Sequence, residues 1–134
     1  MIDIEDKIES LIAYFKKDKN IIGAWIIGSY GTEYQREDSD IDIAILFKNS
    51  ISIMEEMKIS CNLSDIIGYE KVDTINLKIA PITLQFKVIK DGRCLYEADY
   101  IEISNYMENV FNRYRDEKYY IDRFKREYYE GYGL

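Results

Sequence analysis

The chain has 134 residues, 47% of them hydrophobic and 32% charged, which is the composition of a folded globular protein with room for a single core. The net charge of −7 argues against direct nucleic-acid binding, which depends on basic side chains, and the absence of histidine excludes histidine acid–base catalysis and histidine-bound zinc. No apolar run is long enough to cross a membrane, and the acidic start of the chain lacks the basic residues of a secretory signal, so we expect a cytoplasmic protein.

The two cysteines, Cys61 and Cys94, have neither the C-x-x-C spacing nor the histidine neighbours of a metal site. We expect both to be small, buried apolar residues in a reducing cytoplasm. Because histidine is absent as well, carboxylates, hydroxyl groups and the basic side chains of lysine and arginine must carry whatever chemistry the protein performs.

The first half of the chain predicts a helix, two strands and a second helix. The apolar periodicity of the leading helix is carried by Ile4, Ile8, Leu11, Ile12 and Phe15. A nearly continuous apolar run from Ile21 to Ile27 predicts a buried strand that ends at Gly28, and Ile41 to Phe47 predicts a second strand. A weaker helical pattern between about Ile51 and Ile67 ends at Gly68, and its apolar members are Ile53, Met54, Met57, Cys61 and Leu63.

The second half predicts a third strand from Lys71 to Leu77, then a helix that begins near Pro81 and runs to about Lys90, with Gly92 as its stop. Cys94 to Tyr96 predicts a short edge strand. The last third has the strongest helical stripe, formed by Ile103, Tyr106, Met107, Val110, Phe111 and Tyr114 and extended through Ile121, Phe124 and Tyr128. This order predicts an α/β (α+β) fold in which helices flank a small mixed sheet. We expect one domain over 1–134, with a core of about 1–98 and a C-terminal helix and tail of about 99–134.

Two aspartates stand at the start of the second predicted strand. Asp40 and Asp42 are two residues apart, so their side chains point to one face of a strand while Ile41 and Ile43 point to the other. Two carboxylates roughly 5–6 Å apart repel by about 3 kcal/mol at an effective dielectric of 20. A divalent cation would offset this repulsion, and Mg²⁺ suits one or two carboxylates combined with substrate phosphates. The alternative is a solvated, aspartate-rich entry into the strand.

Two further features favour a nucleotide site. Gly28 closes the first strand, where the backbone can turn tightly, and the Ser29 hydroxyl with the amides that follow can bind phosphate oxygens. Asp73 lies within the third strand, where a charge is unfavourable unless it faces a site. Beside the second strand it would reach the same metal centre, as a ligand and as a general base. The ordinary alternatives are a plain turn for Gly28 and Ser29 and a solubilising edge charge for Asp73.

A Gly-Ser pair, followed after ten residues by Asp-x-Asp and then by a third acid on a later strand, resembles the signature of the DNA polymerase beta-like nucleotidyltransferases. The short form of the chain is similar to the minimal nucleotidyltransferase (MNT) antitoxins, which are the partners of HEPN-domain ribonuclease toxins. The resemblance covers the leading helix and the segments from Gly28 to Phe47, from Val72 to Leu77 and from Ala80 to Glu97.

The resemblance implies a palm-like sheet that binds ATP and Mg²⁺, with two metal ions. The metal-binding and catalytic carboxylates would be those of Asp40, Asp42 and Asp73, and the residues on the triphosphate would be Gly28, Ser29 and Arg36. It also implies an adenylyltransferase that transfers AMP from ATP to a tyrosine hydroxyl of a partner HEPN ribonuclease toxin, within a hetero-oligomer, and thereby neutralises the toxin. Where many relatives carry basic or small residues, this chain has Tyr30, Thr32 and Glu33, so the resemblance does not identify every basic group on the triphosphate.

Tyrosine and arginine alternate toward the end of the chain, which holds six of its thirteen tyrosines from Tyr114 to Tyr132. Both residue types are favoured at interfaces, so this segment is either a docking helix for a partner or a helix packed on its own sheet with a polar end. Two other functions stay open: a non-catalytic antitoxin that acts by binding and occlusion, and a small-molecule (antibiotic) nucleotidyltransferase. Enzymes of the latter kind generally add a larger helical domain, and only about 40 residues follow Tyr96.

Overall fold

The structure is a computed structural model that describes residues 4–27 and 40–131. Each predicted helix and strand is present in the predicted order, and two short 3-10 helices are added. In chain order the elements are η1 (Glu5–Lys7), α1 (Ile8–Lys17), β1 (Ile21–Ile27), β2 (Ile41–Phe47), α2 (Ile53–Ile67), β3 (Val72–Asn76), η2 (Leu77–Ile79), α3 (Ile82–Asp91), β4 (Arg93–Glu97) and α4 (Tyr100–Gly131).

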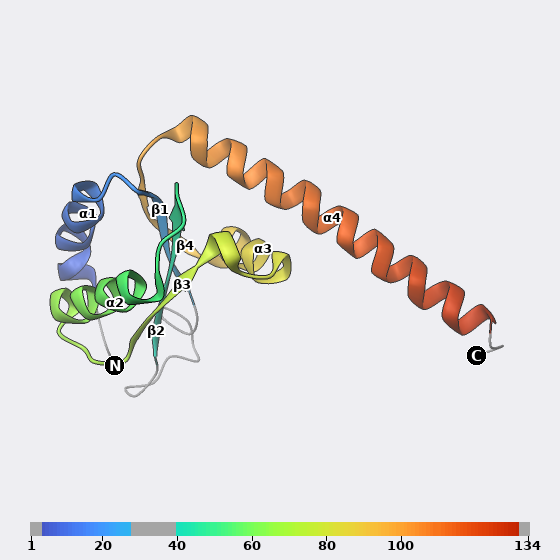
Figure 1. Ribbon diagram of the computed structural model, residues 1–134, viewed down its shortest axis with the longest axis horizontal. Coiled ribbons are helices and arrows are strands. Elements are labelled where there is room, and N and C mark those ends of the chain that lie inside the picture. Colours follow the sequence, from blue (N-terminus) through green and yellow to red (C-terminus); the bar gives the residue numbers. More distant parts are fainter. Residues whose placement is uncertain (1–3, 28–39, 132–134) are drawn as a thin grey trace.

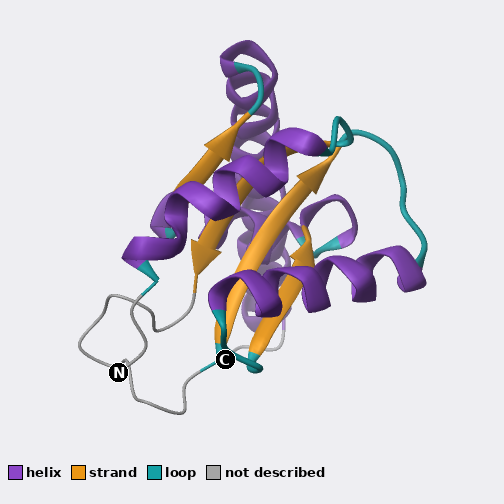
Figure 2. Ribbon diagram, turned by 90° about the vertical axis from the view of Figure 1, so that its left-hand side faces the viewer, coloured by secondary structure: helices purple, strands orange, loops and turns teal. Residues whose placement is uncertain are grey.

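The four strands form one mixed sheet in the order β3-β2-β1-β4. Strand β1 is antiparallel to both β2 and β4, whereas β2 is parallel to β3. Figures 1 and 2 show α1 and α2 on one face of the sheet, and α3 with the beginning of α4 on the other. The predicted architecture, a small mixed sheet flanked by helices with a long C-terminal helix, is therefore confirmed.

The alternation of side chains along β2 gives the sheet two different faces. The odd-numbered residues of Ile41–Phe47 belong to the core cluster under α1 and α2. Ala44 and Leu46 point the other way, into a second cluster under α3 and α4. Asp42 has the same parity as these two residues, so it lies on the α3 face, as the spacing of the two aspartates predicts.

Helix α2 has the predicted end but not the predicted packing face. Ser52 caps its start by accepting a hydrogen bond from the Glu55 amide (3.1 Å), and Gly68 ends it with a φ of 77°. The buried residues are Ile59, Leu63 and Ile67, whereas four of the five apolar residues expected to form the stripe are exposed: Ile53, Met54, Met57 and Cys61. The helix carries two apolar stripes, and contact with β3, which includes a 2.7 Å hydrogen bond between the Ser60 and Thr74 hydroxyls, selects the other one.

Both cysteines are exposed and free, so the expectation that they are buried is wrong. Cys61 lies on the outward side of α2. Cys94 lies on the edge strand β4, where its thiol donates to the Tyr96 carbonyl (3.6 Å) and to the Glu97 carboxylate (3.7 Å). A cysteine is small enough to sit on either side of a helix or an edge strand, so residue type alone does not decide its burial.

Helix α4 is packed at its beginning and exposed further along. Ile103 and Val110 are buried in the second cluster. The close approach depends on Gly23 of β1, because a Cβ there would lie 2.7 Å from the Ile103 Cδ1. Beyond Tyr114 every described side chain, up to residue 127, is exposed, and the helix extends away from the sheet (Figure 1). No helix in the described part of the chain is long and apolar enough to cross a membrane.

Candidate active site

The acidic residues predicted for the site come together at one end of the sheet. Asp42 on β2 is the direct register partner of Asp73 on β3. Asp40, which is exposed, immediately precedes β2, and the Ile41 amide donates to the Lys71 carbonyl at 2.8 Å, which fixes the two strand beginnings side by side. The carboxylates therefore gather at the beginnings of two parallel strands, on the face that α3 covers.

Two more strand ends meet at the same place. Ile27, the last residue of β1, pairs with Asp42, and Ile26 pairs with Arg93 at the beginning of β4. The antiparallel pairing of β1 with β2 therefore places the end of β1 next to Asp42. Gly28, Ser29 and Arg36, expected on the triphosphate, lie outside the described residues.

The carboxylates repel one another. The pKa of Asp42 is raised above its usual value, first by burial and then by the negative charges of Asp73 and Asp40. A bound cation would reverse this effect by favouring the ionised form. No three acidic or cysteine side chains among the described residues are arranged to enclose a metal ion by themselves. The set still fits Mg²⁺, because this ion is commonly held by one or two carboxylates together with substrate phosphates and water.

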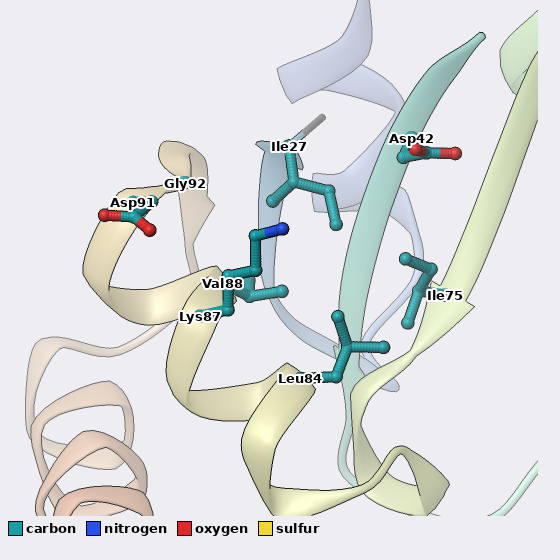
Figure 3. Close-up of a pocket in the computed structure, with 8 residues that line it drawn as sticks. All are labelled: Ile27, Asp42, Ile75, Leu84, Lys87, Val88, Asp91 and Gly92. Carbon is teal, nitrogen blue, oxygen red and sulfur yellow. The ribbon is translucent and has the colours of Figure 1, made fainter. Parts of the chain in front are cut away.

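A pocket of about 270 Å³ opens beside Asp42, between the sheet and α3 (Figure 3). Its walls are mostly aliphatic, and its lining residues are Ile27, Asp42, Ile75, Leu84, Lys87, Val88, Asp91 and Gly92. Gly92 is required for the close packing at its edge, because a Cβ there would collide with the Val88 carbonyl oxygen and approach the Ile27 Cγ2 to 3.0 Å. The pocket therefore joins an apolar surface to the carboxylate end of the sheet.

Lys87 and Asp91 are polar residues of this pocket that the sequence did not single out. Both lie on α3, and Figure 3 shows the Lys87 amino group directed from the helix toward the sheet, with Asp91 at the far end of the helix. A signal was present in the sequence: Leu84, Lys87, Val88 and Asp91 follow the i, i+3, i+4, i+7 spacing of one helix face. Only the packing of α3 shows that this face borders Asp42.

Residues 9–101, more than half of the chain, match the family described as polymerase beta, nucleotidyltransferase. The chain therefore belongs to this nucleotidyltransferase family. A candidate protein adenylyltransferase of Methanocaldococcus jannaschii is 46% identical over 50 residues, which are 37% of this chain and 50% of that protein. The alignment thus spans half the length of this relative.

Solved structures show the same fold. One is a chain of a toxin–antitoxin complex crystallised with AMP-PNP (20% identity, TM-score 0.74, covering 92% of this chain and 96% of that chain). Another is a chain of the complex between the tri-AMPylated HEPN toxin of Shewanella oneidensis and an MNT antitoxin (17% identity, TM-score 0.74, covering 93% of this chain and 98% of that chain). At these identities the likeness concerns the fold, and it extends over nearly the whole of both chains.

Proposed function

We propose that this chain is an antitoxin that transfers AMP from ATP to a tyrosine hydroxyl of a HEPN ribonuclease toxin and so neutralises it. The observation that carries the proposal is the register pairing of Asp42 with Asp73, with Asp40 beside them, in a chain of the nucleotidyltransferase family. The relative named as an adenylyltransferase and the likeness to chains of toxin–antitoxin complexes support the choice of substrate and partner.

In the proposed reaction the tyrosine oxygen attacks the α-phosphorus of ATP. A bond forms between this oxygen and phosphorus, the bond from phosphorus to the β-phosphate oxygen breaks, and pyrophosphate leaves. The proton of the hydroxyl passes to the carboxylate of Asp73, the general base. Asp40 and Asp42 would hold Mg²⁺, whose charge would stabilise the negative charge that develops on the attacking and leaving oxygens.

The metal and nucleotide requirements follow from the charges at the site. Three carboxylates at one end of the sheet of an acidic protein would repel a triphosphate, so binding needs cations from elsewhere. Mg²⁺ would supply this charge, and Ser29 and Arg36 are further candidates for contact with phosphate. Both ATP and Mg²⁺ are available in the cytoplasm, which is where we place the reaction.

The exposed part of α4 supports a protein acceptor over a small molecule. Large aromatic side chains are exposed on it, with exposed fractions of 57% for Tyr119, 66% for Tyr120 and 68% for Phe124. Such side chains are typical of interfaces, and arginines lie among them. This surface also keeps the second candidate open, an antitoxin that acts by binding and occlusion alone.

A transfer assay tests the proposal. The purified chain is incubated with the HEPN protein from the same genome, Mg²⁺ and ATP labelled on the α-phosphate. We expect label on the HEPN protein, lost with EDTA and with Asp42→Asn or Asp73→Asn, and kept with the charge-matched control Asp65→Asn on the opposite face of the sheet. A stable complex without label would instead favour occlusion. Labelling of an aminoglycoside in the absence of any protein acceptor would favour the small-molecule enzyme.

A further inference from the structure

Among the described residues that line the pocket beside Asp42, Lys87 is the one with a cationic side chain. It is exposed, so its ammonium is accessible to a ligand. Within the described part of the chain, Lys87 forms no hydrogen bond or ion pair. Asp91 is not its partner either, although it lies one helical turn further along α3 and borders the same pocket. Figure 3 shows the ammonium directed into the space between α3 and the sheet.

The packing of α3 fixes the side of the helix on which Lys87 lies. Val88, the next residue along, is completely buried in the second core cluster, and Leu84 packs against that cluster one turn earlier. Lys87 lies on the same side of the helix as Leu84, so a small rotation of α3 cannot move it out of the pocket without unpacking Val88. Lys90, on the same helix, differs: its ammonium lies over the Phe86 ring, 5.9 Å from the centroid, and it does not line the pocket.

The pocket thus offers a nucleotide two kinds of contact. Its four aliphatic side chains, from Ile27, Ile75, Leu84 and Val88, form an apolar surface suited to a base or to the carbon face of a ribose. The Lys87 ammonium has three donors and a compact charge, and it stands in the pocket that Asp42 also borders, where the α-phosphate must come for transfer. A lysine is a common point-charge ligand for phosphate.

We propose that this pocket receives the nucleoside end of ATP and that Lys87 binds a phosphate oxygen of the same molecule. This inference rests on the proposed function. It assigns Lys87 as one of the basic residues that contact the triphosphate, which the sequence did not identify. Lys87 acts together with the metal: it offsets part of the charge of the incoming triphosphate and holds the phosphate chain against the carboxylate end of the sheet.

The experiment measures equilibrium binding as well as transfer. A fluorescent ATP analogue is bound first, and ATP with Mg²⁺ or adenosine alone is then titrated in to displace it. Four proteins are compared: the wild-type chain, Lys87→Met, Lys87→Arg and the matched control Lys90→Met. A charge-assisted hydrogen bond to phosphate corresponds to a loss of about 10-fold or more, so Lys87→Met should weaken ATP binding by that factor. We expect Lys87→Arg and Lys90→Met to bind ATP nearly as well as the wild type, and adenosine to bind all four proteins alike.

The outcomes separate this inference from the function on which it rests. Failure of the wild-type chain to bind ATP would overturn the proposed function and with it the role of Lys87. ATP binding by Lys87→Met that equals the wild type would overturn the role of Lys87 and leave the proposed function standing. Equal losses for ATP and adenosine would show that Lys87 shapes the nucleoside pocket, and would overturn its assignment to phosphate. A rise in the KM for ATP with the folded state intact, as judged by thermal melting, would agree with the inference.

Discussion

Replacement of Asp42 by asparagine should stabilise the metal-free protein while it abolishes nucleotide transfer. Asp42 is half-buried and lies in direct register with Asp73, and Asp40 adds a second negative charge. An asparagine keeps the size of the side chain and removes one of the three charges, so the repulsion among them falls. Stability and activity are therefore expected to change in opposite directions, which is typical of a site built for a bound ligand.

The size of the effect follows from the strand spacing. Neighbouring strands lie about 4.8 Å apart, so the two carboxylate charges are roughly 5–6 Å from each other. At that separation the repulsion is about 0.7 kcal/mol in bulk water and about 3 kcal/mol at an effective dielectric of 20. Because Asp73 is exposed, the value near the water limit applies, and we expect a gain of about 1 kcal/mol. For a chain of 134 residues this corresponds to a rise of about 3–5 °C in the melting temperature.

The assay is thermal unfolding in EDTA, followed by circular dichroism between pH 4 and pH 8. Because the pKa of Asp42 is raised in the folded protein, folding favours the protonated carboxyl group. The stability that protonated Asp42 contributes is complete below the ordinary carboxyl pKa, and it is lost as the pH rises through the folded pKa. The advantage of Asp42→Asn should thus be largest near neutral pH and should vanish toward pH 4. With saturating Mg²⁺ and ATP the order should reverse, because ligand at 100 times its Kd stabilises the wild type by about 2.7 kcal/mol.

Glu108→Gln is the matched control, since it removes one negative charge from an exposed position in the first third of α4, outside the carboxylate site. It corrects for the general relief of charge in a protein of net charge −7. If Asp42→Asn melts at or below the temperature of Glu108→Gln in EDTA, the carboxylates do not repel as their register implies, and the reasoning is refuted.

Two further predictions concern positions away from the carboxylates. Gly23→Ala should lower the free energy of unfolding by about 1–3 kcal/mol, because the new methyl group meets the Ile103 Cδ1. Ile103→Val deletes that atom, so in a double-mutant cycle measured by urea unfolding the double variant should lose less stability than the two single variants lose in sum. A loss equal to that sum would contradict the contact. Cys94 should react slowly with iodoacetamide at pH 8, because partial burial of this exposed residue's thiol and the Glu97 carboxylate raise the pKa of the thiol to about 11, which leaves roughly one thiolate in a thousand. Mass spectrometry should show Glu97→Gln accelerating alkylation at Cys94 but not at Cys61, and an unchanged rate at Cys94 would refute the role of Glu97.

Local patterns in the sequence were sufficient to predict the helices, the strands and the acidic character of the candidate site. Apolar runs, helical periodicity and stop residues such as Gly68 are local signals, and they located every α-helix and strand of the described chain but not the two short 3-10 helices. The alternation of side chains along a strand is equally local, so it placed Asp42 on the face opposite Ile41 and Ile43 without knowledge of the fold.

Which of these residues meet depends on contacts between segments that are far apart in the sequence. The pairing of β2 with β3, which brings Asp73 to Asp42, joins segments separated by the whole of α2, and no local pattern encodes its register. Helix α2 has two apolar stripes of similar length, and contact with β3 selected the one that leaves Met54 and Cys61 exposed. Lys87 lines the same pocket as Asp42 only because α3 packs on the face of the sheet to which Asp42 points. Residue type and spacing describe what a side chain can do, but the neighbours with which it acts come from long-range packing, and that is set by the core as a whole.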